Sequence, residues 1–229
     1  MDTTSAGTYM RRKKMEWFDA CDVCLTKPLP YMYAGIILIV KTLIEETIAL
    51  LSDCKTTRIC WYEALDWDKK TVLGFSLWGM CELNTNVSQE STCQRLEAFK
   101  RLPLIQGFHV VSTLLLLTSL ILLSAIVVKM VRIVPSLEYR YPPAVTLCLI
   151  GVTMVLFISS IFQISAIAVY NSNVGDVKRL ASEPYLSQGM AFTLSVLSSA
   201  FSLLAVSAVL MGALLTRSSQ PALTEQEWE

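Results

Sequence analysis

Four cysteines between two long apolar segments could carry disulfide chemistry. They are Cys54, Cys60, Cys81 and Cys93. If this stretch lies on the outer side of a membrane, it passes through the oxidising secretory route, where cysteines pair. Four cysteines allow three connectivities, and we favour Cys54 with Cys60 and Cys81 with Cys93, because each pair closes a short local loop. Asn86 begins an Asn-Val-Ser glycosylation acceptor, which fits the same outer placement.

Three ionisable residues interrupt the first apolar segment, 31–51: Lys41, Glu45 and Glu46. On insertion scales a charged group at the centre of a membrane helix costs about 2.5–3.5 kcal/mol. Lys41 and Glu45 are four residues apart and can pair along one helix face. Either this pair faces the interior of a helix bundle or a water pocket near its outer end, or it contacts the transmembrane helix of a partner channel.

Other reactive residues are sparse. Cys21 and Cys24 form a Cys-x-x-Cys before the first apolar segment, which could be half a zinc site but has no second pair nearby. Palmitoylation next to the membrane is the more natural interpretation, with no modification as the alternative. The single histidine, His109, is expected to make a polar helix contact. Without a nucleophile and base, a phosphate loop or a metal cluster, we expect no enzyme activity, no cofactor and no small-molecule substrate.

Composition indicates a membrane protein, because 53% of the 229 residues are apolar and 17% are charged. The balance of 19 basic and 19 acidic residues gives no reason to expect nucleic acid as a partner. A membrane helix needs about 20 apolar residues. Segments 104–131, 143–170 and 186–215 meet this length, and we count 31–51 as a fourth span because an even number keeps both polar tails on one side.

Basic residues near the spans set the orientation. Lys and Arg cluster at positions 11–14, around 129–140 and at 217. The positive-inside rule makes these regions cytoplasmic, so both termini are expected in the cytoplasm and the protein at the plasma membrane. The connecting segments are then a tail 1–30, an outer loop 52–103, a cytoplasmic loop 132–142, an outer loop 171–185 and a tail 216–229.

The long outer loop is expected to form a small antiparallel sheet. Segments 58–65 and 71–82 are rich in aromatic and β-branched residues and are predicted as strands, while 92–99 is strand or helix. Such a sheet is too small to be stable alone, so disulfides would staple it and it would rest on the membrane end of the helices. Trp78 would be an apolar anchor between the sheet and the helix ends or the lipid headgroups.

The expected fold is therefore a mainly α membrane protein: a left-handed four-helix transmembrane bundle carrying a disulfide-stapled antiparallel extracellular sheet. Serine and alanine are dense in segment 195–208 of the last span. Small faces let membrane helices approach closely. We expect tight packing within the bundle, with a homotypic or partner interface as the alternative.

Leu77, Trp78 and Cys81, followed by Cys93, carry a family resemblance. Together with four spans, a long first outer loop and a short second one, they resemble the claudin superfamily. That superfamily includes claudins, the peripheral myelin and epithelial membrane proteins, and auxiliary subunits of calcium channels and AMPA receptors. Ser76 stands where the family pattern has glycine. The resemblance implies that Trp78 and the Cys81–Cys93 pair belong to the fold of the outer sheet.

Two functions follow from this resemblance. The first is cell–cell contact, a junction or membrane organisation through the outer sheet. The second is an auxiliary, gamma-like subunit that alters the gating or delivery of a channel or receptor, favoured by the second cysteine pair and by the charges in the first span. Seven acidic and seven basic residues in the outer loop predict no ion selectivity. The expected partners are the lipid bilayer and other membrane proteins, by self-association or with a channel or receptor. We prefer the contact function.

Overall fold

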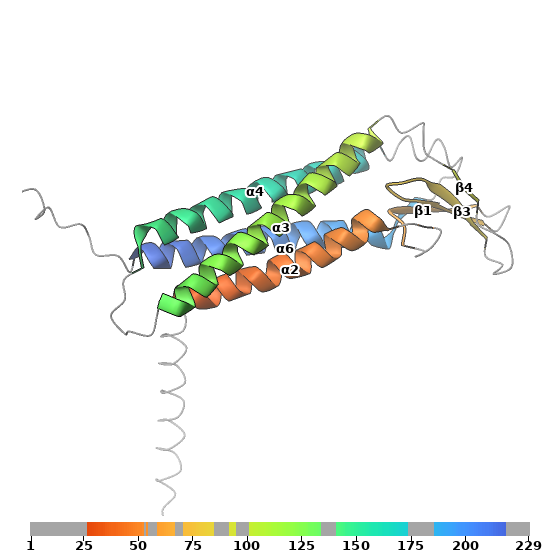
Figure 1. Ribbon diagram of the computed structural model, residues 1–229. Helices are drawn as coiled ribbons and strands as arrows, with labels where there is room; N and C mark the ends of the chain where they lie inside the picture. The colour runs from red at the N-terminus through yellow and green to blue at the C-terminus, as the bar shows by residue number, and fades with distance from the viewer. Residues whose placement is uncertain are drawn as a thin grey trace, which may run out of the picture.

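The computed structural model describes residues 27–52, 54, 59–66, 71–84, 92–94, 101–133, 141–173 and 186–218. Four long helices lie side by side, and a small sheet sits at one end of them (Figure 1). The helices are α2 (Pro28–Leu51), α3 (Leu102–Ile133), α4 (Pro143–Ser172) and α6 (Met190–Ser218).

Three of the described helices, α3, α4 and α6, are long and apolar enough to cross a membrane. The chain is thus a helical membrane protein. Helix α2 has 24 residues and a length of about 36 Å at 1.5 Å per residue. It carries the charges of Lys41, Glu45 and Glu46, so it falls outside the group of three.

The four helices pack in a ring, in which α2 lies against α6 and α3, and α4 lies against α3 and α6. The α2–α6 contact is very close at Gly35, where an added Cβ would lie 2.8 Å from Val209 Cγ2. Small residues of α6 are buried as expected, among them Ser195, Ser198 and Ala205. The small-residue face of the last helix therefore packs within the bundle.

The four helices overlap the four predicted spans, with ends that differ by up to four residues, and the difference matters at the start of the last one. Residues 186–188 were expected to be helical, and this is wrong, because Leu186–Gln188 forms strand β5 and α6 begins at Met190. Gly189 separates the two elements. Its N–H donates to Trp61 O at 2.9 Å, and its α-carbon lies so close to the Cys60 backbone that a side chain would clash.

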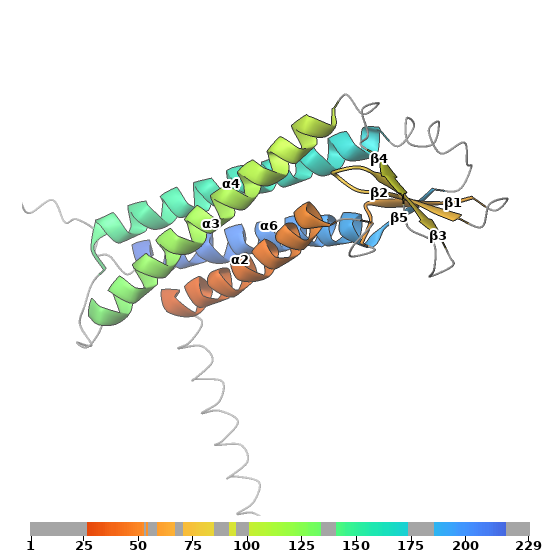
Figure 2. The ribbon, with the colours of Figure 1, turned by 45° about the vertical axis from the view of Figure 1, so that its right-hand side comes forward.

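The sheet has five antiparallel strands in the order β4-β3-β2-β1-β5. Strand β5 directly precedes α6 and lies beside β1, which is more than 100 residues earlier in the chain (Figure 2). The other strands are β1 (Tyr62–Asp66), β2 (Thr71–Phe75), β3 (Met80–Asn84) and β4 (Thr92–Gln94).

The strand prediction for 71–82 is wrong, because this segment forms two strands around a turn at residues 76–79. Ser76 makes the turn. Its N–H donates to Gly79 O at 2.8 Å, and its hydroxyl accepts from Gly79 N–H at 3.1 Å and from Trp78 N–H at 3.2 Å. A serine that binds nearby backbone groups in this way competes with a continuous strand. The segment expected at 58–65 becomes a strand from Tyr62, and 92–99 begins as the strand β4, with 95–99 outside the described residues.

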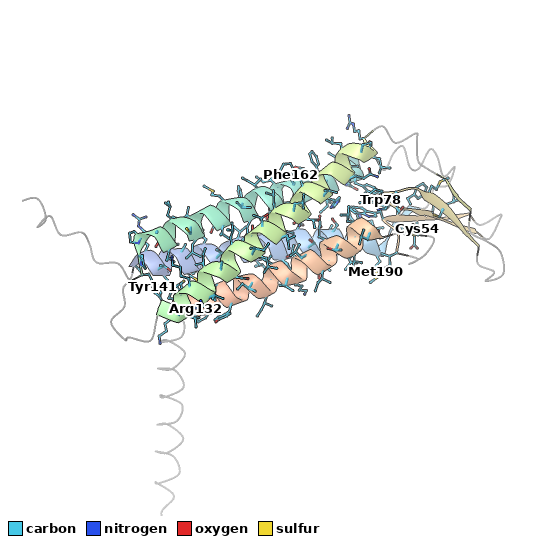
Figure 3. The ribbon with its side chains drawn as sticks, viewed as in Figure 1. Cys54, Trp78, Arg132, Tyr141, Phe162 and Met190 are labelled. Carbon is cyan, nitrogen blue, oxygen red and sulfur yellow. A yellow bond between two sulfur atoms is a disulfide. The ribbon has the colours of Figure 1, made fainter. Side chains whose placement is uncertain are left out.

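Two apolar clusters fill the fold. One lies among the four helices and includes Ile39, Leu116, Leu156 and Val209. The other joins the sheet to the helix ends and is centred on Trp61. Cys54 and Trp78 lie at the sheet end of the molecule, whereas Arg132 and Tyr141 lie at the opposite end (Figure 3).

The contact at Gly35 predicts a selective packing defect. Gly35→Leu should destabilise the bundle by about 1–3 kcal/mol, because the new side chain must displace Val209 in a filled interface. Gly151→Leu on α4 is the matched control, since a Cβ there meets nothing within 4 Å. Thermal unfolding in detergent micelles measures both, and equal melting temperatures for the two variants would contradict this packing.

Candidate functional site

The four predicted cysteines lie in the sheet or just before it. Cys54 and Cys60 form a disulfide, the pair favoured from the sequence. Cys81 lies directly opposite Cys93 in the β3–β4 register and is itself disulfide-bonded. Opposed residues of antiparallel strands have Cα atoms about 4.5–5.5 Å apart, which suits a disulfide. The Cys93 side chain lies outside the described part of the structure, so the Cys81–Cys93 bond stays a prediction.

Gly74 provides room for the first disulfide. A Cβ at this position would lie 2.6 Å from Cys60 Sγ and 3.0 Å from Cys54 Sγ. Cys54, Cys60 and Cys81 are buried together beside it, and Gly74 pairs with Cys81 across β2 and β3. The sheet therefore needs a glycine here, because any side chain would occupy the space of the sulfur atoms.

Trp61 is the central contact between the sheet and the helices. It is fully buried, and its indole Nε1 donates to Ala49 O at 3.1 Å in the last turn of α2. Its ring centre lies 4.7 Å from that of Tyr170 on α4 and 5.1 Å from that of His109 on α3. Phe192 of α6 lies at 6.2 Å. One side chain at the start of the sheet thus contacts all four helices.

Tyr62 extends this aromatic cluster. Its ring stacks on Tyr170 with a centroid distance of 5.3 Å, and its hydroxyl donates to Asn171 Oδ1 at 3.2 Å. Burial raises the pKa of the Tyr62 phenol, so the neutral form that donates this hydrogen bond persists above the usual range for tyrosine. We call Trp61, Tyr62, Tyr170 and Phe192 the aromatic seat of the sheet.

The family-motif residues Leu77 and Trp78 lie in the turn between β2 and β3. Trp78 is 48% exposed, and its Nε1 donates to Leu50 O at 2.6 Å. Leu77 is buried, and its carbonyl accepts from Gln106 Nε2 of α3 at 2.6 Å. Trp78 thus contacts the end of α2 from the surface (Figure 3), while Trp61 fills the interior. Trp61 was not among the predicted functional residues, although it stands in a Cys-Trp-Tyr run shortly after the first apolar segment.

The three ionisable residues of α2 separate into two environments. Lys41 is 51% exposed on its side chain, with Nζ 4.0 Å from Glu45 Oε1 and 3.7 Å from the centre of the Phe201 ring. The Lys41–Glu45 pair therefore does not face the bundle interior, because its lysine points outward beside α6. The Glu46 side chain points the opposite way, into the bundle, and is fully buried.

Glu46 lies in a polar layer to which every helix contributes. Its Oε1 is 2.6 Å from His109 Nδ1 of α3, and its Oε2 accepts from Ser198 Oγ of α6 at 3.1 Å. Ser198 Oγ accepts in turn from Gln163 Nε2 of α4 at 3.3 Å. All four side chains are fully buried. Glu46 and His109 were each noticed in the sequence, but no contact between them was predicted.

Serine pairs continue the layer between neighbouring helices. Ser112 of α3 and Ser159 of α4 are 3.0 Å apart, and Ser160 of α4 and Ser202 of α6 are 2.7 Å apart. Along each helix these polar residues fall between the apolar cluster under the sheet and the one in the bundle. The layer is thus a belt of hydrogen bonds across an otherwise apolar core.

The remaining predicted sites, Asn86, Cys21 and Cys24, lie outside the described residues, so glycosylation and palmitoylation stay predictions. Within the part of the chain that the structure describes, no group of three or more His, Cys, Asp or Glu side chains could hold a metal ion.

Neither a protein-family model nor a curated protein matches the chain.

The aromatic seat predicts unequal roles for two tryptophans. Trp61→Ala should destabilise the protein by about 3–5 kcal/mol, because it empties a fully buried volume under the sheet. Trp78→Ala should cost about 1 kcal/mol, since it removes one hydrogen bond from a half-exposed ring. Thermal unfolding gives the stability, and limited proteolysis of the outer segment reports loosening of the sheet. A larger effect at Trp78 would contradict these assignments.

Proposed function

We propose that the chain is a non-enzymatic, claudin-like four-span membrane protein that acts in cell–cell contact or membrane organisation through its outer sheet. The observation that supports this best is the five-stranded sheet built from two distant segments and held on the helix ends by the aromatic seat. Such a sheet is a rigid surface with a fixed orientation relative to the helices. That suits recognition of another protein on the same or the facing membrane.

The fourth span in this proposal is α2. It runs along α6 and α3, and large apolar side chains cover its outward face. These are Tyr33, Ile37, Val40, Ile44, Ile48 and Leu51. The acidic group that would oppose insertion, Glu46, is buried against polar partners, while Lys41 pairs with Glu45. A helix with an apolar exterior and an internally satisfied carboxylate fits a membrane-crossing position.

The orientation follows from the two ends of the molecule. Arg132 and Tyr141 lie opposite the sheet (Figure 3), Lys129 lies near the end of α3, and Arg217 belongs to the last turn of α6. With the positive-inside rule, that end faces the cytoplasm and the disulfide-bearing sheet faces outside.

Mixed cell cultures test the contact function. Fluorescently tagged protein expressed in cells that lack junction strands should concentrate at borders between two expressing cells, because the outer sheets then face each other. Borders between an expressing and a non-expressing cell are the internal control. Uniform distribution at both kinds of border, with the protein at the cell surface, would contradict adhesion between like molecules.

A second candidate function, an auxiliary subunit of a channel or receptor, is favoured by Lys41. A half-exposed lysine near the middle of α2 has one carboxylate and one aromatic ring as neighbours, and its remaining surface is open. A polar or acidic residue on a partner's membrane helix would satisfy it more fully than lipid does.

Substitution of Lys41 distinguishes this second function. K41L should reach the cell surface normally and lose recovery of the partner protein from native membranes, because the exposed charge is gone. K129L is the matched control, since Lys129 is an exposed lysine near the far end of α3. Normal partner recovery by K41L would exclude the lysine contact.

A further inference from the structure

The end of the bundle opposite the sheet carries basic side chains from three helices. They are Lys27 just before α2, Lys129 and Arg132 near the end of α3, and Arg217 in the last turn of α6, and all four are exposed. Arg132 lies at the far end from Cys54 and Trp78 (Figure 3). We call these four residues the basic collar.

No carboxylate in the described part of the chain balances the collar. The ion pairs of the described residues are Lys41–Glu45 and His109–Glu46, so none of the four cations takes part in one. The acidic residues that the structure describes belong to the second half of α2 or to the sheet, and they are Glu45, Glu46, Glu63, Asp66 and Glu82. Within the described residues, the collar is thus a surface of uncompensated positive charge.

Helix packing brings the collar residues to similar depths. Gly35 of α2, Val209 of α6 and Leu123 of α3 meet at one level, since a Cβ at Gly35 would lie 2.8 Å from Val209 Cγ2 and 3.5 Å from Leu123 Cδ2. Away from the sheet, the collar residues of α2 and α6 are each eight residues beyond this level, and those of α3 are six and nine residues beyond it. At 1.5 Å per residue these steps span about 9–14 Å, so the cations form a band about 5 Å thick.

Trp78 marks the opposite boundary of the helices. Its ring is 48% exposed, and its Nε1 donates to Leu50 O at 2.6 Å. Leu50 follows Lys27 by 23 residues on α2, which is about 35 Å along the helix. The hydrocarbon core of a bilayer is about 30 Å thick, and tryptophan and basic side chains favour its two borders. With Trp78 at one border, the collar therefore lies at the depth of the headgroups on the other side.

We propose that the basic collar binds anionic phospholipids of the phosphatidylserine type and concentrates them around the protein in one leaflet. Lysine and arginine donate charge-assisted hydrogen bonds to phosphate and carboxylate oxygens, and basic residues next to membrane helices attract anionic lipid. These lipids supply the negative charge that the described residues lack at this end. The inference requires only that the bundle crosses a bilayer, so it does not depend on the contact function proposed above.

The collar is one-sided. Helix α2 lies between α3 and α6, and all three contribute cations. Helix α4, on the other side of the bundle, contains no lysine or arginine. The bound anionic lipids are therefore expected beside α3, α2 and α6 rather than beside α4.

Spin-labelled lipids measure this preference on the full chain. The protein is reconstituted in phosphatidylcholine bilayers with a trace of spin-labelled phosphatidylserine or spin-labelled phosphatidylcholine, and electron spin resonance gives the fraction of label immobilised at the protein. We expect phosphatidylserine to be immobilised several times more than phosphatidylcholine. About 1 M salt should abolish the difference, because the screening length falls to about 3 Å. Equal immobilisation of the two lipids at low salt, or a preference that survives high salt, would overturn the proposal.

Two arginines at the opposite ends of α3 supply matched variants. R132Q should lower the ratio of immobilised phosphatidylserine to phosphatidylcholine by up to about fivefold. R101Q should leave the ratio unchanged, because Arg101 is exposed but lies 31 residues, or about 46 Å, from Arg132, farther than the full bilayer thickness of about 40–45 Å.

The triple variant K27Q/R132Q/R217Q should bring the ratio close to one. Immobilisation of labelled phosphatidylcholine, measured in parallel, shows whether each variant still presents its helices to lipid. A triple variant with the wild-type ratio, or an R101Q effect as large as that of R132Q, would show that the collar is not the lipid site.

Discussion

A fully buried carboxylate in a membrane protein must be satisfied by its neighbours, and Glu46 imposes this requirement on all four helices. His109, Ser198 and, through Ser198, Gln163 come from α3, α6 and α4 to meet it. These contacts are directional, whereas apolar side chains pack in many ways. A helix that rotates or slides by one turn leaves a buried charge without a partner, which typically costs about 3–5 kcal/mol. The polar layer therefore strongly disfavours alternative arrangements of the helices, whereas its net contribution to the stability of the bundle is small by comparison.

The aromatic seat continues this arrangement toward the sheet. Trp61 touches His109 of the polar layer on one side and belongs to the strand-bearing segment on the other, with its N–H bonded to Phe75 O at 2.7 Å. The sheet is therefore held in a fixed position relative to the helices, just as the helices are held relative to one another. A claudin-like contact protein and an auxiliary subunit would both benefit, because each must present its outer surface in a defined orientation.

Sequence patterns predicted the elements better than their contacts. The apolar segments, the Cys54–Cys60 disulfide and the small antiparallel sheet all follow from local composition and spacing. The turn at 76–79 was missed because Val72, Phe75 and Trp78, which lie before it and within it, suggest a continuous strand, although Ser76 and Gly79 are typical turn residues. The Glu46–His109 pair joins positions 63 residues apart. It depends on which helices are neighbours and how they are rotated, and a single sequence does not contain that information.

The pairing of β5 with β1 has a consequence for how the chain is made. Strand β1 ends at Asp66, whereas its edge partner begins at Leu186, after α3 and α4. The ribosome must therefore synthesise most of the protein before the sheet can be completed. Until α6 is made, Trp61 lacks its contact with Phe192, so its ring is not yet fully enclosed. The last part of the chain thus also completes the sheet, which acquires its final form only in molecules that have been synthesised as far as α6.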